Sequence, residues 1–230
     1  MLGLGNSLTA KRYSSGVWTP TNLGNKLIHW YKFNTGISTT VIDSANQITS
    51  WEDQKGSNNA APSVTNDKNK MAKLESDGSV RFNNTGDELL FSSNITLGKF
   101  AIYGRFRSSN FGDRLLQKTT GDEFIKFQTT TEFRIQTAIG TRHDMVVSGS
   151  LANNTKFTAG FERAANGDIS AFANGNASST SANTAISDTI VLGKMDADLT
   201  GTLDIFELII CDDVLSSSDR TEINAYLDAI

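Results

Sequence analysis

The last thirty residues of this 230-residue chain join a strongly apolar run to a helix signal. Residues 203–211, rich in Ile and Leu, predict a buried strand. Asp219 and Glu222 have the spacing of a capping box, in which each side chain accepts a hydrogen bond from an otherwise unpaired backbone N–H. Apolar residues then recur at helical spacing, at Ile223, Tyr226, Leu227 and Ile230. The pattern predicts a β-protein that ends in one short helix, with Tyr226 and Leu227 packed back on the β-structure to seal one edge.

Upstream of this segment the chain consists of short apolar runs separated by turn signals. The predicted strands are residues 27–33, 48–51, 80–82, 88–91, 100–107, 114–118, 124–128, 132–138, 144–148, 156–163, 169–172, 189–192 and 203–211. Short strands at this spacing are typical of a sandwich or barrel. Asn166-Gly167 predicts a type I′ hairpin turn, with positive φ at both residues, and Asn174-Gly175 is a second such signal. The polar stretches 52–70 and 173–184 are expected to be loops.

Composition limits the class of protein. The 38% of hydrophobic residues, with 13 Phe, are enough for the core of one large sandwich or of two small domains. The net charge of −4, with dispersed cations, argues against a nucleic-acid partner. No run approaches the roughly 20 apolar residues of a membrane span, and the N-terminus lacks the apolar centre of a signal peptide, so we expect it to belong to the mature protein. The single cysteine, Cys211, excludes an internal disulfide and is expected to be an inert buried thiol.

Few residues have the pattern of a catalytic or metal site. The two histidines, His29 and His143, are too few for a three-His zinc site, and His29 is expected to be structural because Ile28 and Trp30 flank it in a strand. Trp30 and Trp51 are placed in the core, with stacking on sugars as the alternative. No nucleophile elbow or P-loop occurs. These patterns predict neither catalytic residues nor a bound cofactor.

Several segments, in this order, resemble the concanavalin A-like jelly-roll superfamily and, within it, the laminin-G-like domains. The resemblance covers residues 25–230. It rests on Trp-Glu-Asp-Gln at 51–54, Asp-Gly-Ser-Val-Arg-Phe-Asn at 77–83, Phe-Ala-Ile-Tyr-Gly-Arg-Phe-Arg at 100–107, Phe-Ala-Asn-Gly at 172–175 and the closing strand with its Leu-Ser helix start at 201–216. It implies an all-β fold, a two-sheet antiparallel jelly-roll sandwich with one short C-terminal helix.

The same resemblance raises hydrolysis and calcium binding as expectations to test. Laminarinase-type members carry Glu-x-Asp-x-x-Glu on one strand, which aligns two carboxylates across the scissile bond. Here Glu123 and Glu132 stand alone, as solvated strand ends, so no enzyme activity is expected. Lectin-like sandwiches often hold calcium at the rim, but the acids at 87–88 and 196–198 match no specified calcium loop and are interpreted as ordinary turn acids, with calcium left as the alternative.

The first residues, Met-Leu-Gly-Leu-Gly-Asn-Ser-Leu, resemble the start of virion proteins of marine tailed phages, especially cyanophages. This likeness implies an extended arm over residues 1–22 that precedes a lectin-like domain over 23–230. The alternative is a flexible leader. If the arm is ordered in an assembly, Leu2, Leu4, Tyr13 and Trp18 are the expected contacts.

Three functions follow from these interpretations. The first is a non-enzymatic capsid or tail decoration protein, located in the virion, with other virion proteins or further copies of itself as partners. The second is a module that binds host cell-surface polysaccharide, which rests on fold analogy alone. The third, a glycoside hydrolase, is disfavoured because the carboxylate triplet is missing. Neither nucleic acid nor a membrane is an expected partner.

Overall fold

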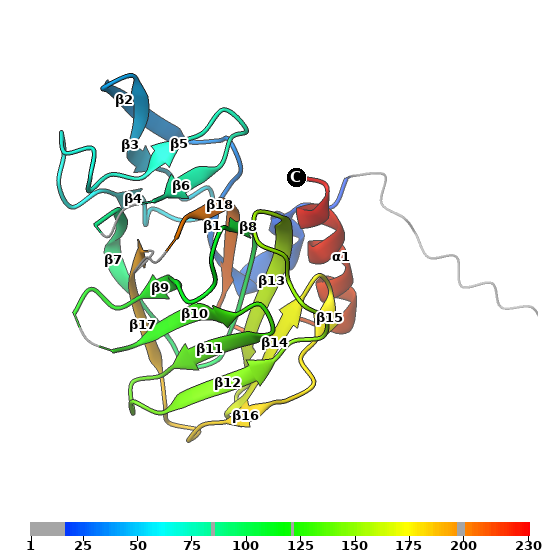
Figure 1. The fold of residues 1–230 in the computed structure, drawn as a ribbon. Coiled ribbons are helices and arrows are strands. Elements are labelled where there is room, and N and C mark those ends of the chain that lie inside the picture. Colours follow the sequence, from blue (N-terminus) through cyan, green and yellow to red (C-terminus); the bar gives the residue numbers. More distant parts are fainter. Residues whose placement is uncertain (1–16, 84–85, 121, 197–200) are drawn as a thin grey trace, which may run out of the picture.

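The protein is an all-β, two-sheet antiparallel jelly-roll sandwich that ends in one short helix, as the sequence predicts (Figure 1). The structure is a computed structural model and describes residues 17–83, 86–120, 122–196 and 201–230. In these ranges α1, Ser217–Asp228, is the sole α-helix, and η1, Pro20–Lys26, is a 3₁₀-helix that precedes the first strand.

One sheet, here called the helix-covered sheet, contains the strand that the apolar C-terminal run predicts. In spatial order its strands are β1 (Leu27–Tyr31), β18 (Leu203–Cys211), β8 (Phe100–Ser108), β13 (Lys156–Arg163) and β14 (Asp168–Ala173). The short β6 (Val80–Phe82) pairs with the first residues of β18, and β15 (Asn176–Ala177) and β16 (Ala182–Asn183) pair with β14. The stretch 173–184, predicted as a loop, therefore adds two short strands to this sheet.

The second sheet, here called the open sheet, faces the first across the core. Its order is β4 (Ala60–Ala61), β7 (Glu88–Leu97), β17 (Ile190–Asp196), β9 (Arg114–Gln117), β10 (Phe124–Thr129), β11 (Glu132–Gln136) and β12 (Arg142–Val146). The stretch 52–70 is a loop apart from the two residues of β4.

A hairpin of which the sequence predicted only residues 48–51 links the two sheets, through β4 on one side and through a short strand that pairs with β6 on the other. It consists of β2 (Ile37–Ile42) and β3 (Ala45–Trp51), and β3 pairs with β4 and with β5 (Lys73–Leu74). Neither face of β2 is buried, so its residues show no alternation of apolar and polar types. Its turn at Asp43 and Ser44 has positive φ at both residues without the usual Asn-Gly signal.

Phenylalanines from both sheets meet in the core. Phe127 and Phe133 of the open sheet contact Phe157 and Phe161 of the helix-covered sheet, with ring centroids 5.0–6.0 Å apart. Aromatic pairs at such separations contribute beyond the area they bury. These contacts set how the two sheets pack.

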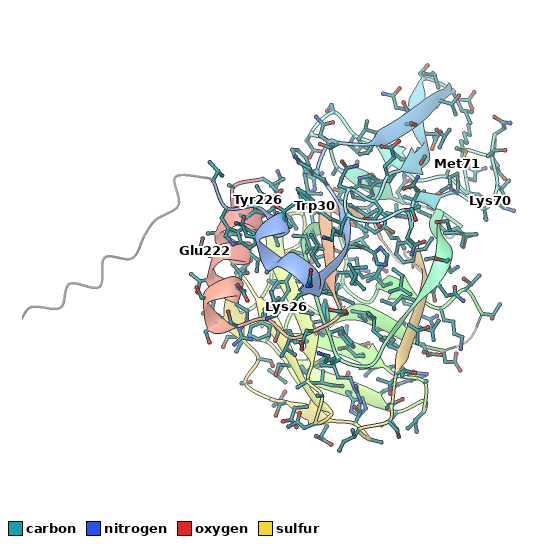
Figure 2. All side chains as sticks on the ribbon, turned by 180° about the vertical axis from the view of Figure 1, so that it is seen from behind. Lys26, Trp30, Lys70, Met71, Glu222 and Tyr226 are labelled. Atoms are coloured by element: carbon teal, nitrogen blue, oxygen red, sulfur yellow. The ribbon has the colours of Figure 1, made fainter. Side chains whose placement is uncertain are left out.

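A second apolar layer lies on the other side of the helix-covered sheet. There α1 and η1 lie side by side (Figure 2). Their buried leucines, Leu23 and Leu227, cluster with Trp30, Tyr103 and Ile209 of the sheet. The predicted packing of Tyr226 and Leu227 on the β-structure is confirmed, but the helix covers a face of the sheet and seals no edge. Because both faces are covered, every residue of β18 is buried.

Two buried carboxylates fix this outer layer to the sheet. Glu207 accepts hydrogen bonds from Trp30 Nε1 at 2.6 Å and Phe33 N at 2.9 Å, and the Tyr226 hydroxyl of α1 also donates to it. Glu162 accepts from Tyr103 Oη at 2.8 Å and from an Arg220 guanidinium nitrogen at 3.0 Å. Burial raises the pKa of both carboxyl groups, and these donors partly offset the rise.

The capping box of α1 lies one turn earlier than predicted. Ser216 is the N-cap, and its Oγ accepts a hydrogen bond from Asp219 N at 3.1 Å. The Asp219 carboxylate in turn accepts from Ser216 N at 3.3 Å. The Asp219–Glu222 box was therefore wrong: Ser-x-x-Asp has the same spacing and stands where the chain enters the helix from extended backbone.

Of the two Asn-Gly turns, one has the predicted geometry. Asn174 and Gly175 both have positive φ, at 47° and 79°, as a type I′ turn requires. In the other hairpin only Gly167, with φ 91°, is left-handed, and its N–H donates to Ala164 O. The type I′ turn predicted at Asn166-Gly167 was therefore wrong. These two residues also fit a longer loop, in which a turn is followed by a glycine with positive φ.

Asp53, in the Trp-Glu-Asp-Gln segment, ties β1 to the loop after β3. Its carboxylate accepts hydrogen bonds from His29 Nδ1 at 2.7 Å, Trp30 N at 2.9 Å and Lys55 N at 3.0 Å. Burial raises the pKa of Asp53, but these donors and the N–H of Gly56 outweigh it and lower the pKa to about 2. The structural role predicted for His29 is confirmed.

Candidate functional site

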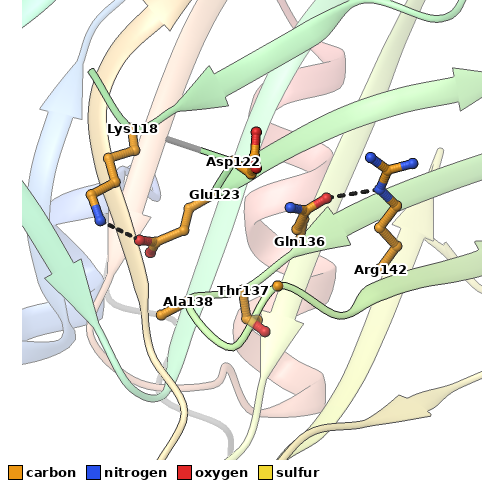
Figure 3. Close-up of a pocket in the computed structure, with 8 residues that line it drawn as sticks. Lys118, Asp122, Glu123, Gln136, Thr137, Ala138 and Arg142 are labelled. Atoms are coloured by element: carbon orange, nitrogen blue, oxygen red, sulfur yellow. Dashed lines mark hydrogen bonds and ion pairs between the residues drawn. The ribbon is translucent and has the colours of Figure 1, made fainter. Parts of the chain in front are cut away.

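A polar pocket lies at one end of the open sheet, where β9 and β11 end and β10 and β12 begin (Figure 3). Its volume is about 660 Å³, within the roughly 300–1,000 Å³ of small-molecule sites. The lining residues are Lys118, Asp122, Glu123, Gln136, Thr137, Ala138, Gly140 and Arg142. We call this the strand-end pocket.

Two hydrogen-bonded pairs line opposite parts of the pocket, with Asp122 between them (Figure 3). Lys118 Nζ donates to Glu123 Oε1 at 2.6 Å, and the second oxygen of Glu123 accepts from Val191 N at 2.5 Å. In the other pair Arg142 Nε donates to Gln136 Oε1 at 2.9 Å. Neighbouring strands therefore hold the polar groups in place before any ligand arrives.

The remaining groups of the pocket leave hydrogen-bonding capacity for a ligand. Arg142 and Asp122 are exposed. Thr137 also lines the pocket, but it is 1% exposed and its Oγ1 is buried, so this hydroxyl is not open to a ligand. Cationic donors and carboxylate and amide acceptors thus meet in one concave site, an arrangement that suits a ligand with several hydroxyl groups.

Sequence reasoning missed this pocket. Glu123 was interpreted as a solvated strand end, but it is 5% exposed and paired with Lys118, so that interpretation was wrong. Lys118, Gln136 and Arg142 stand in separate turns and strands, and no motif connects them. The one signal in the sequence was the position of the polar residues. They gather at 117–123 and again at 136–144, around the turn between β9 and β10 and the turn between β11 and β12.

The expected assembly contacts lie elsewhere or outside the described residues. Leu2, Leu4 and Tyr13 are not among the residues that the structure describes. Trp18 is partly buried in the outer layer, with its ring 5.7 Å from that of Tyr226. The boundary at residue 22 stays a prediction, and η1 crosses it.

The other residues singled out in the sequence are accounted for by the fold. Trp30 and Trp51 are buried, as predicted. Cys211 is fully buried, and burial raises the pKa of its thiol to about 12, so it is not a reactive thiolate. His143 points toward the core, where burial lowers its pKa.

The acids considered for calcium already have partners where the structure describes them. Asp87 accepts a hydrogen bond from Asn83 N, and Glu88 pairs with Lys194 Nζ at 2.7 Å. The carboxylates of Asp196 and Asp198 lie outside the described side chains. Among the side chains that are described, no three His, Cys, Asp or Glu residues gather as a metal site. Neither helix of the described ranges is long and apolar enough to cross a bilayer.

Comparison with known proteins shows the fold. A scan against protein-family models and a search of curated proteins found no match. Among solved structures, the chain is similar to the ligand-binding domain of botulinum neurotoxin serotype D in complex with N-acetylneuraminic acid, with a TM-score of 0.61 and 13% identity over 92% of this chain and 53% of that one. It is also similar to Trypanosoma rangeli sialidase, with a TM-score of 0.59 and 11% identity over 93% of this chain and 34% of that one.

A third similar structure is the receptor-binding domain of botulinum neurotoxin type G, with a TM-score of 0.55 and 12% identity over 87% of this chain and 51% of that one. The chain thus spans about half the length of the toxin domains and a third of the sialidase. At these identities the comparisons establish a jelly-roll β-sandwich shared with parts of larger proteins.

Proposed function

We propose that this chain is a carbohydrate-binding module that holds sugar units in the strand-end pocket. The observation that carries the proposal is the arrangement of the two polar pairs, Lys118–Glu123 and Gln136–Arg142, around one concave site. Each hydroxyl of a sugar donates one hydrogen bond and accepts others, so it needs donors and acceptors side by side. The pocket supplies both, from the ends of strands and the turns next to them.

The similar structures support the class of ligand. The serotype D domain was solved with N-acetylneuraminic acid, and the sialidase with sialic acid. Because the chain matches only parts of those proteins, the likeness supports carbohydrate binding as a class and carries over no individual subsite.

Binding fits the pocket better than hydrolysis does. A glycosidase needs one carboxylic acid that gives a proton to the leaving oxygen and a second carboxylate at a set separation. Both oxygens of Glu123 already accept hydrogen bonds, from Lys118 and from Val191 N, so neither is placed to donate to a leaving oxygen. We infer that the module binds sugar without cleaving it, and incubation with a bound oligosaccharide should release no new reducing ends.

A glycan array followed by titration calorimetry tests the proposal. We expect at least one class of polysaccharide to bind, and Arg142→Ala to weaken that binding tenfold or more, since a hydrogen bond from a charged group contributes about 1.5–3 kcal/mol. Lys68→Ala is the control, because Lys68 is also an exposed cation but pairs with Asp43 beside the β2–β3 hairpin. If no sugar binds, either in the presence of calcium or in the presence of a chelator, the proposal is refuted.

We propose separately that the protein is part of a phage particle. This proposal rests on the resemblance of residues 1–8 to the start of virion proteins of marine tailed phages. The two proposals are compatible, since a decoration protein that is anchored by its first residues leaves a sugar pocket on the sandwich accessible. Mass spectrometry of purified particles tests it, and the absence of the protein from them would refute it.

A further inference from the structure

The outward face of the open sheet carries two rows of side chains that begin at the strand-end pocket. Strand register sets Gln117, Phe124, Gln136 and Arg142 side by side in the first row, and Arg114, Lys126, Arg134 and Asp144 in the second. Successive side chains of a strand point to opposite faces. The residues that alternate with these rows, Ile125 and Ile135 between them and Phe127 and Phe133 beyond the second, belong to the core, so both rows lie on the outward face.

Lys126 lies at the centre of this face, among cations. Its Nζ donates to the neutral Gly112 O at 3.1 Å. Burial lowers the pKa of Lys126, and the guanidinium groups of Arg134, Arg114 and Arg142 lower it further, against a smaller opposite effect of Asp113. Three guanidinium groups therefore act on this ammonium, although the whole chain carries a net charge of −4.

The ring of Phe124 packs against two of these cations, Arg114 and Lys126. The Arg114 guanidinium carbon lies 4.7 Å from the centre of the Phe124 ring, and Lys126 Nζ lies 6.0 Å from it. Phe124 is itself 4% exposed. The ring therefore offers no stacking platform of its own and holds the two cations over the face instead.

Three acids on and beside this face are paired with cations. Asp144 binds Arg134 with both oxygens, at 2.5 and 2.7 Å, and Glu88 and Glu123 pair with Lys194 and Lys118. By contrast, Lys126 and Arg142 donate to neutral acceptors, the carbonyl of Gly112 and the amide of Gln136. These two cations are placed to receive anionic groups from a ligand.

We propose that the sugar bound by this module is acidic: a polysaccharide with carboxylated units, which extends from the strand-end pocket along the two rows, with carboxylates at Lys126 and Arg142. This inference rests on the proposed function and names the class of sugar. A phosphate polymer is the other polyanion to consider. The pocket disfavours it, because a phosphate polymer such as dT12 has no hydroxyl groups along its backbone to donate to Asp122 and Glu123, whereas an acidic sugar carries hydroxyls beside its carboxylates.

The test compares matched sugars by calorimetry on the full chain. The probes are β-1,4-linked hexasaccharides of mannuronate and mannose, and of glucuronate and glucose, which within each pair differ by the carboxylate, with a dT12 oligonucleotide as the phosphate polymer. We expect an acidic sugar to bind at least tenfold more tightly than its neutral partner in 0.1 M NaCl. The difference should shrink in 1 M NaCl, where the screening length falls from about 10 Å to about 3 Å.

Lys126→Gln should remove most of the preference for the acidic sugar and leave the affinity for the neutral one nearly unchanged. Lys156→Gln is the control, because Lys156 also donates to a main-chain oxygen, that of the terminal residue Ile230, and lies over a phenylalanine ring, but on the helix-covered sheet. This variant should keep the wild-type preference for the acidic sugar. The comparison thus separates the effect of the position of Lys126 from the effect of losing any lysine with similar contacts.

The outcomes separate this inference from the proposed function. Equal affinity for acidic and neutral sugars, or equal loss of both in Lys126→Gln, overturns the inference and leaves carbohydrate binding standing. Binding of dT12 as tightly as the acidic sugar overturns it in favour of a nucleic-acid ligand. If only neutral sugars on the glycan array bind, the inference fails, and if no sugar binds, the proposed function fails with it.

Discussion

Truncation of Leu227 to alanine tests whether α1 is an integral layer of the sandwich. Leu227 is 0% exposed and lies between α1 and the helix-covered sheet, in a cluster with Tyr103, Ile209 and Ile223. A buried Leu→Ala change costs about 2–5 kcal/mol, because apolar contact is lost and a cavity remains. For a chain of this size each kcal/mol lowers Tm by about 2–4 °C, so we expect a fall of roughly 4–20 °C.

Urea denaturation and calorimetry measure this change, with Glu222→Ala as the control on the same helix. Glu222 is exposed, and alanine is the better helix former, so the control should stay within about 0.5 kcal/mol of the wild type. Sugar affinity at 25 °C should be equal in both variants, since the strand-end pocket lies on the other sheet. A loss below about 1 kcal/mol for Leu227→Ala would show that the helix is not packed as described.

Two further changes test local features. Ser216→Ala should lower the free energy of unfolding by about 1 kcal/mol in urea titrations, because it removes the cap that holds Asp219 N, whereas an unchanged value would favour the alternative box with Glu222. Asp53→Asn should cost roughly 2 kcal/mol at pH 7, because the folded-state pKa of about 2 lies below the ordinary 3.8. In the wild type the unfolded state binds more protons between these values, so the stabilisation by Asp53 is complete above pH 3.8 and is lost as pH falls toward 2. Midpoints in urea from pH 2 to 7 should therefore slope less in Asp53→Asn, and equal slopes would contradict this role.

The elements that local pattern predicted well are those whose surroundings repeat along the chain. The 203–211 run became β18 at the predicted bounds because a strand with both faces covered is apolar at nearly every position. Ile223 and Leu227 were identified by helical spacing, since one face of α1 packs on the sheet. Local signals failed where two candidates shared one pattern, as with the capping boxes that start at Ser216 and Asp219.

The strand-end pocket could not be predicted in the same way, because its residues meet only through strand pairing. Gln136 and Arg142 lie opposite each other across a turn, and Gln136 also pairs with Phe124, next to Glu123. A one-residue slip in either register would turn these side chains into the core. The site therefore depends on register, which the core residues on the opposite face of each strand determine.

The contrast between the two sheets nevertheless indicates where a binding face belongs. In β18 both faces are buried, and the helix layer leaves no outward row for a ligand. In β10 and β11 the core residues Ile125, Phe127, Phe133 and Ile135 alternate with Phe124, Lys126, Arg134 and Gln136. Such alternation is what a sheet with one uncovered face requires. The outward cations of the open sheet, Lys126, Arg134 and Arg142, are not part of the core, so their gathering calls for an explanation other than folding, and the proposed acidic sugar supplies one.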